Sequence, residues 1–277
     1  MRVRGARLPQ RAATRVVLAL GLVALGLPAQ AGRPCNTPQP PTLQTVQRAL
    51  GLAERTDQAL SAGGAQVVLL ARAGQDLTRY GLRYSHLGLA WRQTGDGGRP
   101  VWRVLHKLNQ CGSAVAHLYV QGLGDFFMDD LWRFEAAWVV PTPEVQTRLL
   151  ALLQDPARVQ QLHRKPYSMV SYVWGQKYQQ SNQWAIETLA IAMAPNAGPI
   201  TRTQAQGWLQ ATGYQPSVLK IGALTRLGGR ITAANVAFDD HPPEKRFSDR
   251  IETVTVDSVF SWMTRSGMAS LPVVTLR

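Results

Sequence analysis

Three polar side chains in this 277-residue chain could together carry out nucleophilic acyl chemistry. His86 precedes the small apolar run 87–91 and is the strongest candidate for a general base. His106 lies late in a second apolar run and could orient that base, while Ser181 opens a helical pattern and could attack. Such chemistry needs an attacking atom, a base that takes its proton and a group that fixes the tautomer of the base. The three residues are far apart in sequence, so the site depends on folding.

Ser181 stands at the expected start of a helix over 181–190. A helix N-terminus favours negative charge, because its N–H groups are unpaired and the positive end of the helix dipole lies there. Asn182 and neighbouring amides could therefore steady an oxyanion, and we expect Gln183 and Tyr178 to contact substrate. A second interpretation stays open, in which Ser181 is an N-cap, since serine is a preferred capping residue. A serine hydroxyl also titrates far above a thiol, so His86 alone would form little attacking anion.

Apolar periodicity predicts the elements that must position these residues. The strands around the Gly95–Gly98 turn form a hairpin, and antiparallel pairing would bring the His86 and His106 rings to the same end of the sheet. The predicted elements are a helix over 42–61, strands over 67–71, 87–91, 101–108 and 134–140, a loop or short helix over 118–127, and helices over 143–154 and 181–190.

The proline-containing segment 195–199 is the best boundary in the chain. Beyond it the sequence predicts helices over 201–212 and 218–227, strands over 235–238 and 251–256, and a final helix capped by Asp257. We therefore expect an α+β fold, with an antiparallel sheet packed against helices. The expected divisions are a signal peptide over 1–31, a core over 32–194 and a C-terminal α/β extension over 195–277.

The first 31 residues combine five arginines, a short apolar centre and small residues before Ala31, which is typical of a cleavable secretory signal. The apolar run is about 12 residues, and a membrane span needs about 20. We expect a periplasmic or secreted protein without a transmembrane anchor after cleavage. The formal charge falls from +13 to +8 (13 − 5). Cell-envelope polymers or lipids are the expected partners, nucleic acid is not, and the oligomeric state is undetermined.

The two cysteines, Cys35 and Cys111, would enter an oxidising compartment, where an isolated pair most often forms a disulfide. The alternative is Cys111 as a nucleophile near His106, which requires a free thiol.

Four acidic residues could suggest a site for a hard cation, but acids at this spacing are usually solvated or cap helices, and no calcium-loop pattern occurs. We expect no metal and no cofactor. The four are Asp125, Asp129, Asp130 and Glu135.

The runs Val67–Leu70 and Tyr84–Leu89, with the late helix, resemble the circularly permuted branch of the NlpC-type papain-like fold, which includes lecithin:retinol acyltransferase-like proteins. The resemblance covers about residues 67–190. It implies His86 as base, His106 as orienter, and Ser181 where those relatives carry a cysteine. The runs His106–Gly112, Asp125–Asp130 and Ser181–Trp184 also resemble an exported bacterial family catalogued as domain of unknown function 2145, a likeness that implies no activity.

Two functions follow from these expectations. The first is an exported hydrolase or acyltransferase acting on amide or ester bonds of the cell envelope. The second is a catalytically inactive papain-like domain that binds envelope material or a partner protein.

Overall fold

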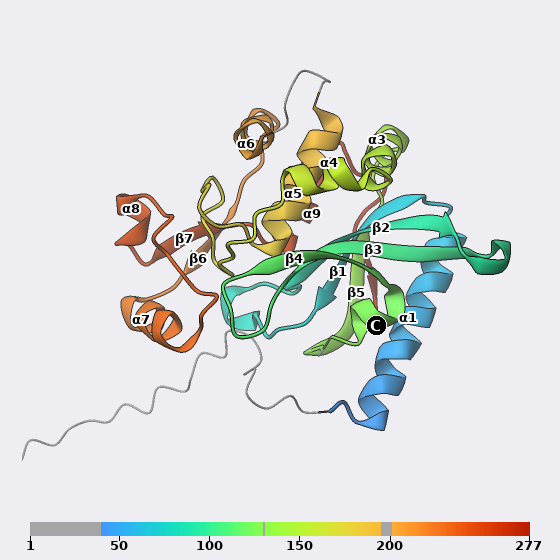
Figure 1. Cartoon of the computed structure of the whole chain (residues 1–277), viewed down its shortest axis with the longest axis horizontal. Helices are drawn as coiled ribbons and strands as arrows, with labels where there is room; N and C mark the ends of the chain where they lie inside the picture. Colours follow the sequence, from blue (N-terminus) through green and yellow to red (C-terminus); the bar gives the residue numbers. More distant parts are fainter. Residues whose placement is uncertain (1–39, 130, 195–200) are drawn as a thin grey trace, which may run out of the picture.

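The fold is α+β, as expected: a six-stranded antiparallel sheet is packed against helices on both faces (Figure 1). The structure is a computed structural model that describes residues 40–129, 131–194 and 201–277. The signal peptide, Cys35, Asp130 and the boundary at 195–199 lie outside the described residues.

The sheet has the strand order β4-β3-β2-β1-β5-β8, and each neighbouring pair is antiparallel. Every residue of β1 is buried, as expected for the centre of a sheet covered on both faces. The predicted hairpin is confirmed, with Leu89 of β2 opposite Leu105 of β3. The strands are β1 (Val67–Ala73), β2 (His86–Thr94), β3 (Pro100–Asn109), β4 (Ala116–Gly122), β5 (Arg133–Val139) and β8 (Val274–Leu276).

Two hydrophobic cores lie on opposite faces of the sheet. On one face, which we call the α5 face, Leu87 and Leu89 pack with Trp184 of α5 (Ser181–Met193). On the other, the α2 face, Ala90 packs with Phe126 of α2 (Leu123–Phe127). The α5 face is also covered by α3 (Pro143–Leu153), α6 (Arg202–Ala211) and α9 (Val256–Arg265), and the α2 face by α1 (Leu43–Ala62).

The remaining elements are short and lie mainly in the C-terminal third. A second sheet pairs β6 (Ser217–Lys220) with β7 (Arg250–Thr253). The other helices are α4 (Pro156–Gln161), α7 (Ala223–Thr232) and α8 (Pro243–Arg246), with 3₁₀ turns at Thr78–Tyr80 and Asp96–Gly98. The strand β8 returns to the edge of the main sheet beside β5, so the end of the chain completes the sheet that the early strands begin.

Several predicted elements were wrong. The predicted helix over 218–227 is β6 followed by α7, with Gly222 as the N-cap between them. The predicted strand over 235–238 is irregular, because its backbone bonds with Ser168 and Met169 instead of a neighbouring strand. The final helix is capped by Thr255, in a capping box with Ser258, and not by Asp257. The segment 118–127 contains most of β4 and then α2.

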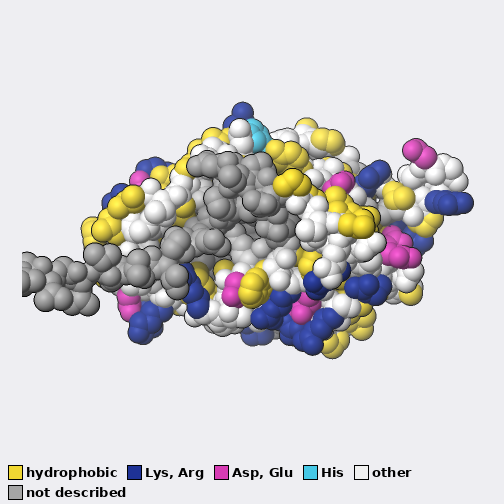
Figure 2. Space-filling view, turned by 90° about the horizontal axis from the view of Figure 1, so that it is seen from below, with side chains coloured by type: hydrophobic (Ala, Val, Ile, Leu, Met, Phe, Trp, Pro, Cys, Tyr) yellow, Lys and Arg dark blue, Asp and Glu magenta, His cyan; other side chains and the backbone are white. Residues whose placement is uncertain are grey.

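Lys and Arg side chains are scattered over the face of the molecule in Figure 2 and form no single block. Within the described ranges, no helix combines the length and apolar character that crossing a bilayer requires.

Candidate functional site

A chain of hydrogen bonds joins His86, His106 and Gln121 across three neighbouring strands. His86 Nε2 lies 2.8 Å from His106 Nδ1, and His106 Nε2 lies 2.7 Å from the Gln121 Oε1. Because an amide oxygen only accepts, His106 donates from Nε2 and accepts at Nδ1 from His86. This fixes both tautomers and leaves the lone pair of His86 on Nδ1. The predicted meeting of the two rings is therefore confirmed.

The histidine pair is buried on the α2 face. The Phe126 ring lies 6.0 Å from the His86 ring and 5.2 Å from the His106 ring. Gly88 makes room for this contact, because a Cβ there would lie 2.4 Å from Val104 Cγ1 and 3.3 Å from the Phe126 ring. The glycine of the Ser-His-x-Gly run is thus required by close packing around the rings.

Arg72 supplies a positive charge beside the two imidazoles. It lies opposite His86 in the sheet, donates to the Phe126 carbonyl, and forms an ion pair with Asp129. Burial lowers the pKa of His86 well below 6.5, and Arg72 and then His106 lower it further. Burial, followed by Arg72, lowers the pKa of His106 to about 4. Both rings are therefore neutral near pH 7, and His86 is a weak base.

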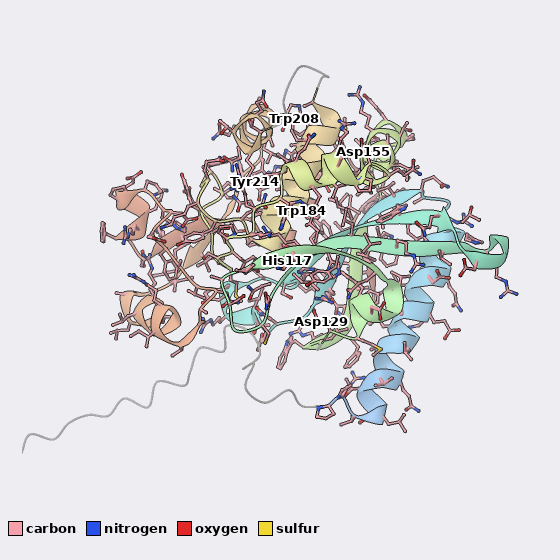
Figure 3. All side chains as sticks on the ribbon, in the orientation of Figure 1. His117, Asp129, Asp155, Trp184, Trp208 and Tyr214 are labelled. Atoms are coloured by element: carbon pink, nitrogen blue, oxygen red, sulfur yellow. The ribbon has the colours of Figure 1, made fainter. Side chains whose placement is uncertain are left out.

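Ser181 and the His86 ring lie on opposite faces of the sheet. Consecutive side chains of a strand point to opposite faces, and His86 shares its face with the Phe126 contact, whereas Leu87 faces α5. In β3 the same alternation holds, since His106 contacts Phe126 while Lys107 Nζ donates to the Gln179 side chain just before α5. In Figure 3, Trp184 of α5 and Asp129, the partner of Arg72, lie on opposite sides of the sheet.

The opening turn of α5 meets the backbone around His86 and not its imidazole ring, which the predicted site requires there. The Leu87 amide donates to Asn182 Oδ1 at 2.9 Å, and Asn182 Nδ2 donates to the Ser85 carbonyl at 3.4 Å. The Asn182 side chain therefore holds the backbone on both sides of His86, through Ser85 and Leu87. No hydrogen bond joins His86 to Ser181 among the described residues.

Ser181 is the first residue of α5, and its N-cap is Gln180, whose side chain accepts from the Asn182 amide. The interpretation of Ser181 as the N-cap was therefore wrong. The Tyr167 ring lies against Ser181: burial raises the pKa of Tyr167, and interaction with the Ser181 hydroxyl and backbone partly offsets that rise. Both residues are buried, so the hydroxyl of Ser181 faces protein and not solvent.

The three predicted substrate contacts have partners within the chain. Asn182 is bound to the His86 strand, as described above. Gln183 is buried and bonds to the Ser171 hydroxyl at 2.8 Å and to the Val173 carbonyl at 2.9 Å. Tyr178 lies at the surface beside Lys177. The structure thus brings together the His86 and His106 rings, places the Asn182 side chain on the backbone beside His86, and leaves Tyr178 outside this group.

A buried polar network fixes α5 behind the sheet. Glu187 of α5 pairs with Arg202 of α6 through two bonds of 2.8 and 3.0 Å, and also accepts from Gln206 at 2.7 Å and from Gln179 at 2.6 Å. Lys107 joins the network through Gln179, and burial, followed by Arg202, lowers its pKa to about 6. The charges of Glu187 and Arg202 satisfy each other, which indicates a structural role.

The other candidate residues are placed as follows. Asp129 and Glu135 are taken up in ion pairs with Arg72 and Arg83. In the described part of the chain no three His, Cys, Asp or Glu side chains gather in a way that could hold a metal ion. No described cysteine is free, which argues against Cys111 as a nucleophile. The Cys35–Cys111 bridge stays a prediction, since Cys35 lies outside the described residues.

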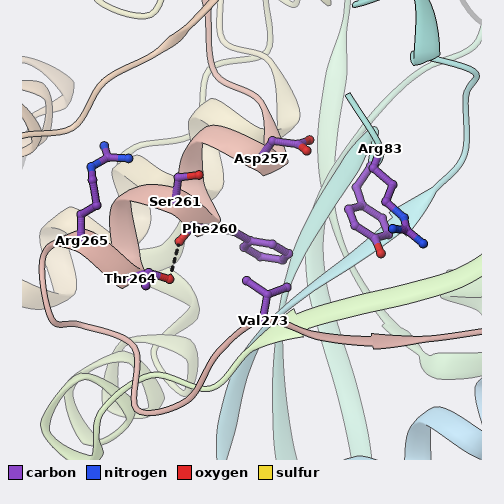
Figure 4. Close-up of a pocket in the computed structure, with 8 residues that line it drawn as sticks. Arg83, Asp257, Phe260, Ser261, Thr264, Arg265 and Val273 are labelled. Atoms are coloured by element: carbon purple, nitrogen blue, oxygen red, sulfur yellow. Dashed lines mark hydrogen bonds between the residues drawn. The ribbon is translucent and has the colours of Figure 1, made fainter. Parts of the chain in front are cut away.

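A surface pocket among the described residues does not include the histidines. It lies between the start of β2 and α9 (Figure 4). Asp257 is in its wall, and burial raises the pKa of that carboxyl. The pocket is lined by Arg83, Tyr84, Asp257, Phe260, Ser261, Thr264, Arg265 and Val273.

Sequence reasoning missed Arg72, Gln121 and Phe126. Arg72 had a signal, because a single arginine that ends the apolar run 67–71 is unusual unless it is paired. Gln121 and Phe126 had none that is local, since their positions depend on the pairing of β3 with β4 and on the docking of α2.

A comparison with known families finds one whose description is "uncharacterized protein conserved in bacteria", domain of unknown function 2145, which matches residues 59–263. No curated protein and no solved structure matches the chain.

Proposed function

We propose that this chain, which belongs to the bacterial family catalogued as domain of unknown function 2145, is an exported cell-envelope protein that binds an envelope polymer or lipid. In this proposal its core is a permuted papain-like domain that does not cut its ligand through His86 and Ser181. The observation that supports it is the placement of the His86 ring and Ser181 on opposite faces of the sheet.

A base must lie within about 2.6–3.2 Å of the atom that carries the proton it takes, or reach it through one water. A strand whose backbone is bonded to Asn182 stands between the two groups here. The buried, Arg72-flanked imidazole is also a poorer base than a free one, and serine needs a stronger base than cysteine does. The separation of the two side chains and the lowered pKa of His86 therefore both oppose proton transfer from Ser181 to His86.

Binding is supported by charge. The expected mature chain carries +8 (13 − 5), and Lys and Arg side chains are spread over the face that Figure 2 shows. Envelope polymers and many bacterial lipids are anionic, so a cationic exported surface would be attracted to them.

A hydrolase or acyltransferase is the second candidate. It is favoured by the chain of hydrogen bonds from Gln121 to His86, which fixes the base tautomer and leaves Nδ1 as an acceptor. Such an enzyme would use His86 with an attacking group other than Ser181, on the α2 face.

The two candidates separate in one experiment. The mature chain, His86→Ala and Ser181→Ala are incubated with muropeptides and acyl esters, and in parallel are sedimented with purified cell-wall sacculi and with anionic vesicles. We expect no turnover above the blank, and equal sedimentation of all three proteins with one of the two materials. Turnover that both variants lose would overturn the proposal, and turnover that only His86→Ala loses would establish the second candidate.

A further inference from the structure

The helix α7 is built with its apolar side outward. Leu224, Leu227 and Ile231 form one stripe at helical spacing, with side chains 86%, 55% and 74% exposed. The opposite side of the helix, with Arg226 and Gly229, is buried. An ordinary surface helix has the reverse arrangement, since its apolar stripe faces the core.

Arg226 fixes this orientation. Its guanidinium donates to the Ile221 carbonyl at 3.0 Å, to the Arg246 carbonyl at 2.5 Å and to the Ser248 carbonyl. The helix is thus held by a buried cation through three backbone acceptors: one from the segment before α7, one from the last residue of α8 and one from Ser248 just after it. The outward stripe is therefore a fixed surface feature.

Positive charge surrounds the stripe. Arg230 lies on α7 itself and is exposed. The Lys220 side chain, just before the helix, is 83% exposed, and its Nζ lies 3.8 Å from the Asp249 carboxylate at the surface. Between residues 217 and 250 there are six Lys or Arg and four Asp or Glu, a balance of +2 (6 − 4). Of the acids, Asp239 pairs with Lys177 and Asp240 is buried against His241. Of the cations, Arg226 is buried and Lys245 pairs with Glu252, so the outward balance stays at +2 (4 − 2).

A second exposed apolar side chain lies at the same end of the molecule. Phe247 is 81% exposed and sits between the two residues whose carbonyls hold Arg226. The end of the molecule formed by α7 and α8 shows hydrophobic side chains next to Lys and Arg (Figure 2).

We propose that the outward face of α7 docks on an anionic phospholipid surface, with Leu224, Leu227 and Ile231 entering the headgroup region and Arg230 and Lys220 contacting the lipid phosphates. This inference rests on the proposed function and names the lipid as the partner. An apolar helix face with a basic rim is the pattern of interfacial helices, and large exposed apolar patches on soluble proteins mark interaction sites.

The test uses mature protein, residues 32–277, with vesicles of phosphatidylglycerol or of phosphatidylcholine. The parent should bind the anionic vesicles, and more strongly than the neutral ones. The double variant Leu227→Glu/Ile231→Glu should bind them about tenfold or more weakly, because charges replace two exposed aliphatic side chains that would enter the headgroup region. The matched control is Val120→Glu/Leu271→Glu, which adds the same charge at positions 58% and 54% exposed outside α7 and should bind more tightly than the α7 variant.

Three results would overturn the inference. The first is a parent protein that does not bind anionic vesicles, and the second is an α7 variant that binds them as tightly as the control does. The third is light scattering that shows a dimer for the parent and the control but a monomer for the α7 variant. In the third case the stripe would be a contact between two copies. Turnover of muropeptides or esters in the same samples would contradict the proposed function and leave the vesicle result standing, so the two failures are distinguishable.

Discussion

At the residue scale, the neutral state of the histidine pair follows from burial next to Arg72. His106 is fully buried, and its pKa of about 4 in the folded chain lies below the 6.5 of an unperturbed histidine. Between these two pH values the unfolded chain binds more protons than the folded one. The contribution of His106 to the free energy of unfolding is therefore fully present above about pH 6.5 and is lost as the pH falls toward 4. The loss from His106 alone is roughly 3 kcal/mol of unfolding free energy.

Two measurements check this prediction. Imidazole resonances followed by NMR should show His106 titrating near pH 4, and denaturant unfolding at several pH values should show the fall in stability. In His106→Gln the part of the pH dependence that His106 causes should disappear. A His106 pKa at or above 6.5 would contradict the burial and the Arg72 contact on which this account depends.

The sequence predicted which histidines meet but not the face on which their rings lie. The hairpin places His86 and His106 together because their strands pair around one turn. Alternation from Leu87, an apolar core residue, indicates that His86 faces the other way. Tertiary contacts such as those of Trp184 decide on which face of the sheet α5 packs. No local sequence pattern encodes these contacts.

At the scale of elements, α5 is held by the pair Glu187–Arg202, whose side chains are 0% and 2% exposed. Arg202→Met would leave the Glu187 charge buried without its cation, and should cost about 3–5 kcal/mol of unfolding free energy. The matched control is Arg148→Met, which breaks the exposed pair with Glu144 and should cost less than about 1 kcal/mol. Urea unfolding measures both, and equal costs would contradict a structural role for the buried pair.

Long periodic segments were predictable and short ones were not. The helix α1 and the strand β1 have many apolar positions at the right spacing, so they were predicted close to their bounds. By contrast, β6 and β8 have four and three residues, and each forms because a partner strand accepts it. The segment 218–227 has a helical apolar spacing, but pairing with β7 makes its first residues a strand, and the helix begins only at Ala223.

At the scale of the whole molecule, export and the disulfide are predictions that one sample can test. Protein recovered from a bacterial periplasm should begin at Gly32 and contain 246 residues (277 − 31). Its intact mass without reductant should be lower by two hydrogen atoms than after reduction, because Cys35 and Cys111 would be bridged. An intact Met1 start or an unchanged mass on reduction would contradict the export signal or the bridge, respectively.

The fold class could be predicted from the sequence because alternating and helical patterns are both strong. The addition of β8 to the edge of the sheet could not, since β8 at the end of the chain pairs with β5 in its middle and the two share no local signal. The same holds for the outward stripe of α7, whose apolar spacing alone predicts a helix face turned to the core.

The most direct test of the central claim is covalent labelling of the mature protein by a fluorophosphonate, which reacts with serines that a nearby base activates. Intact mass spectrometry should show no added mass on the parent, because the sheet separates the His86 ring from Ser181. A stoichiometric adduct on Ser181 that is absent in His86→Ala would contradict the account, since it requires the two groups to act together.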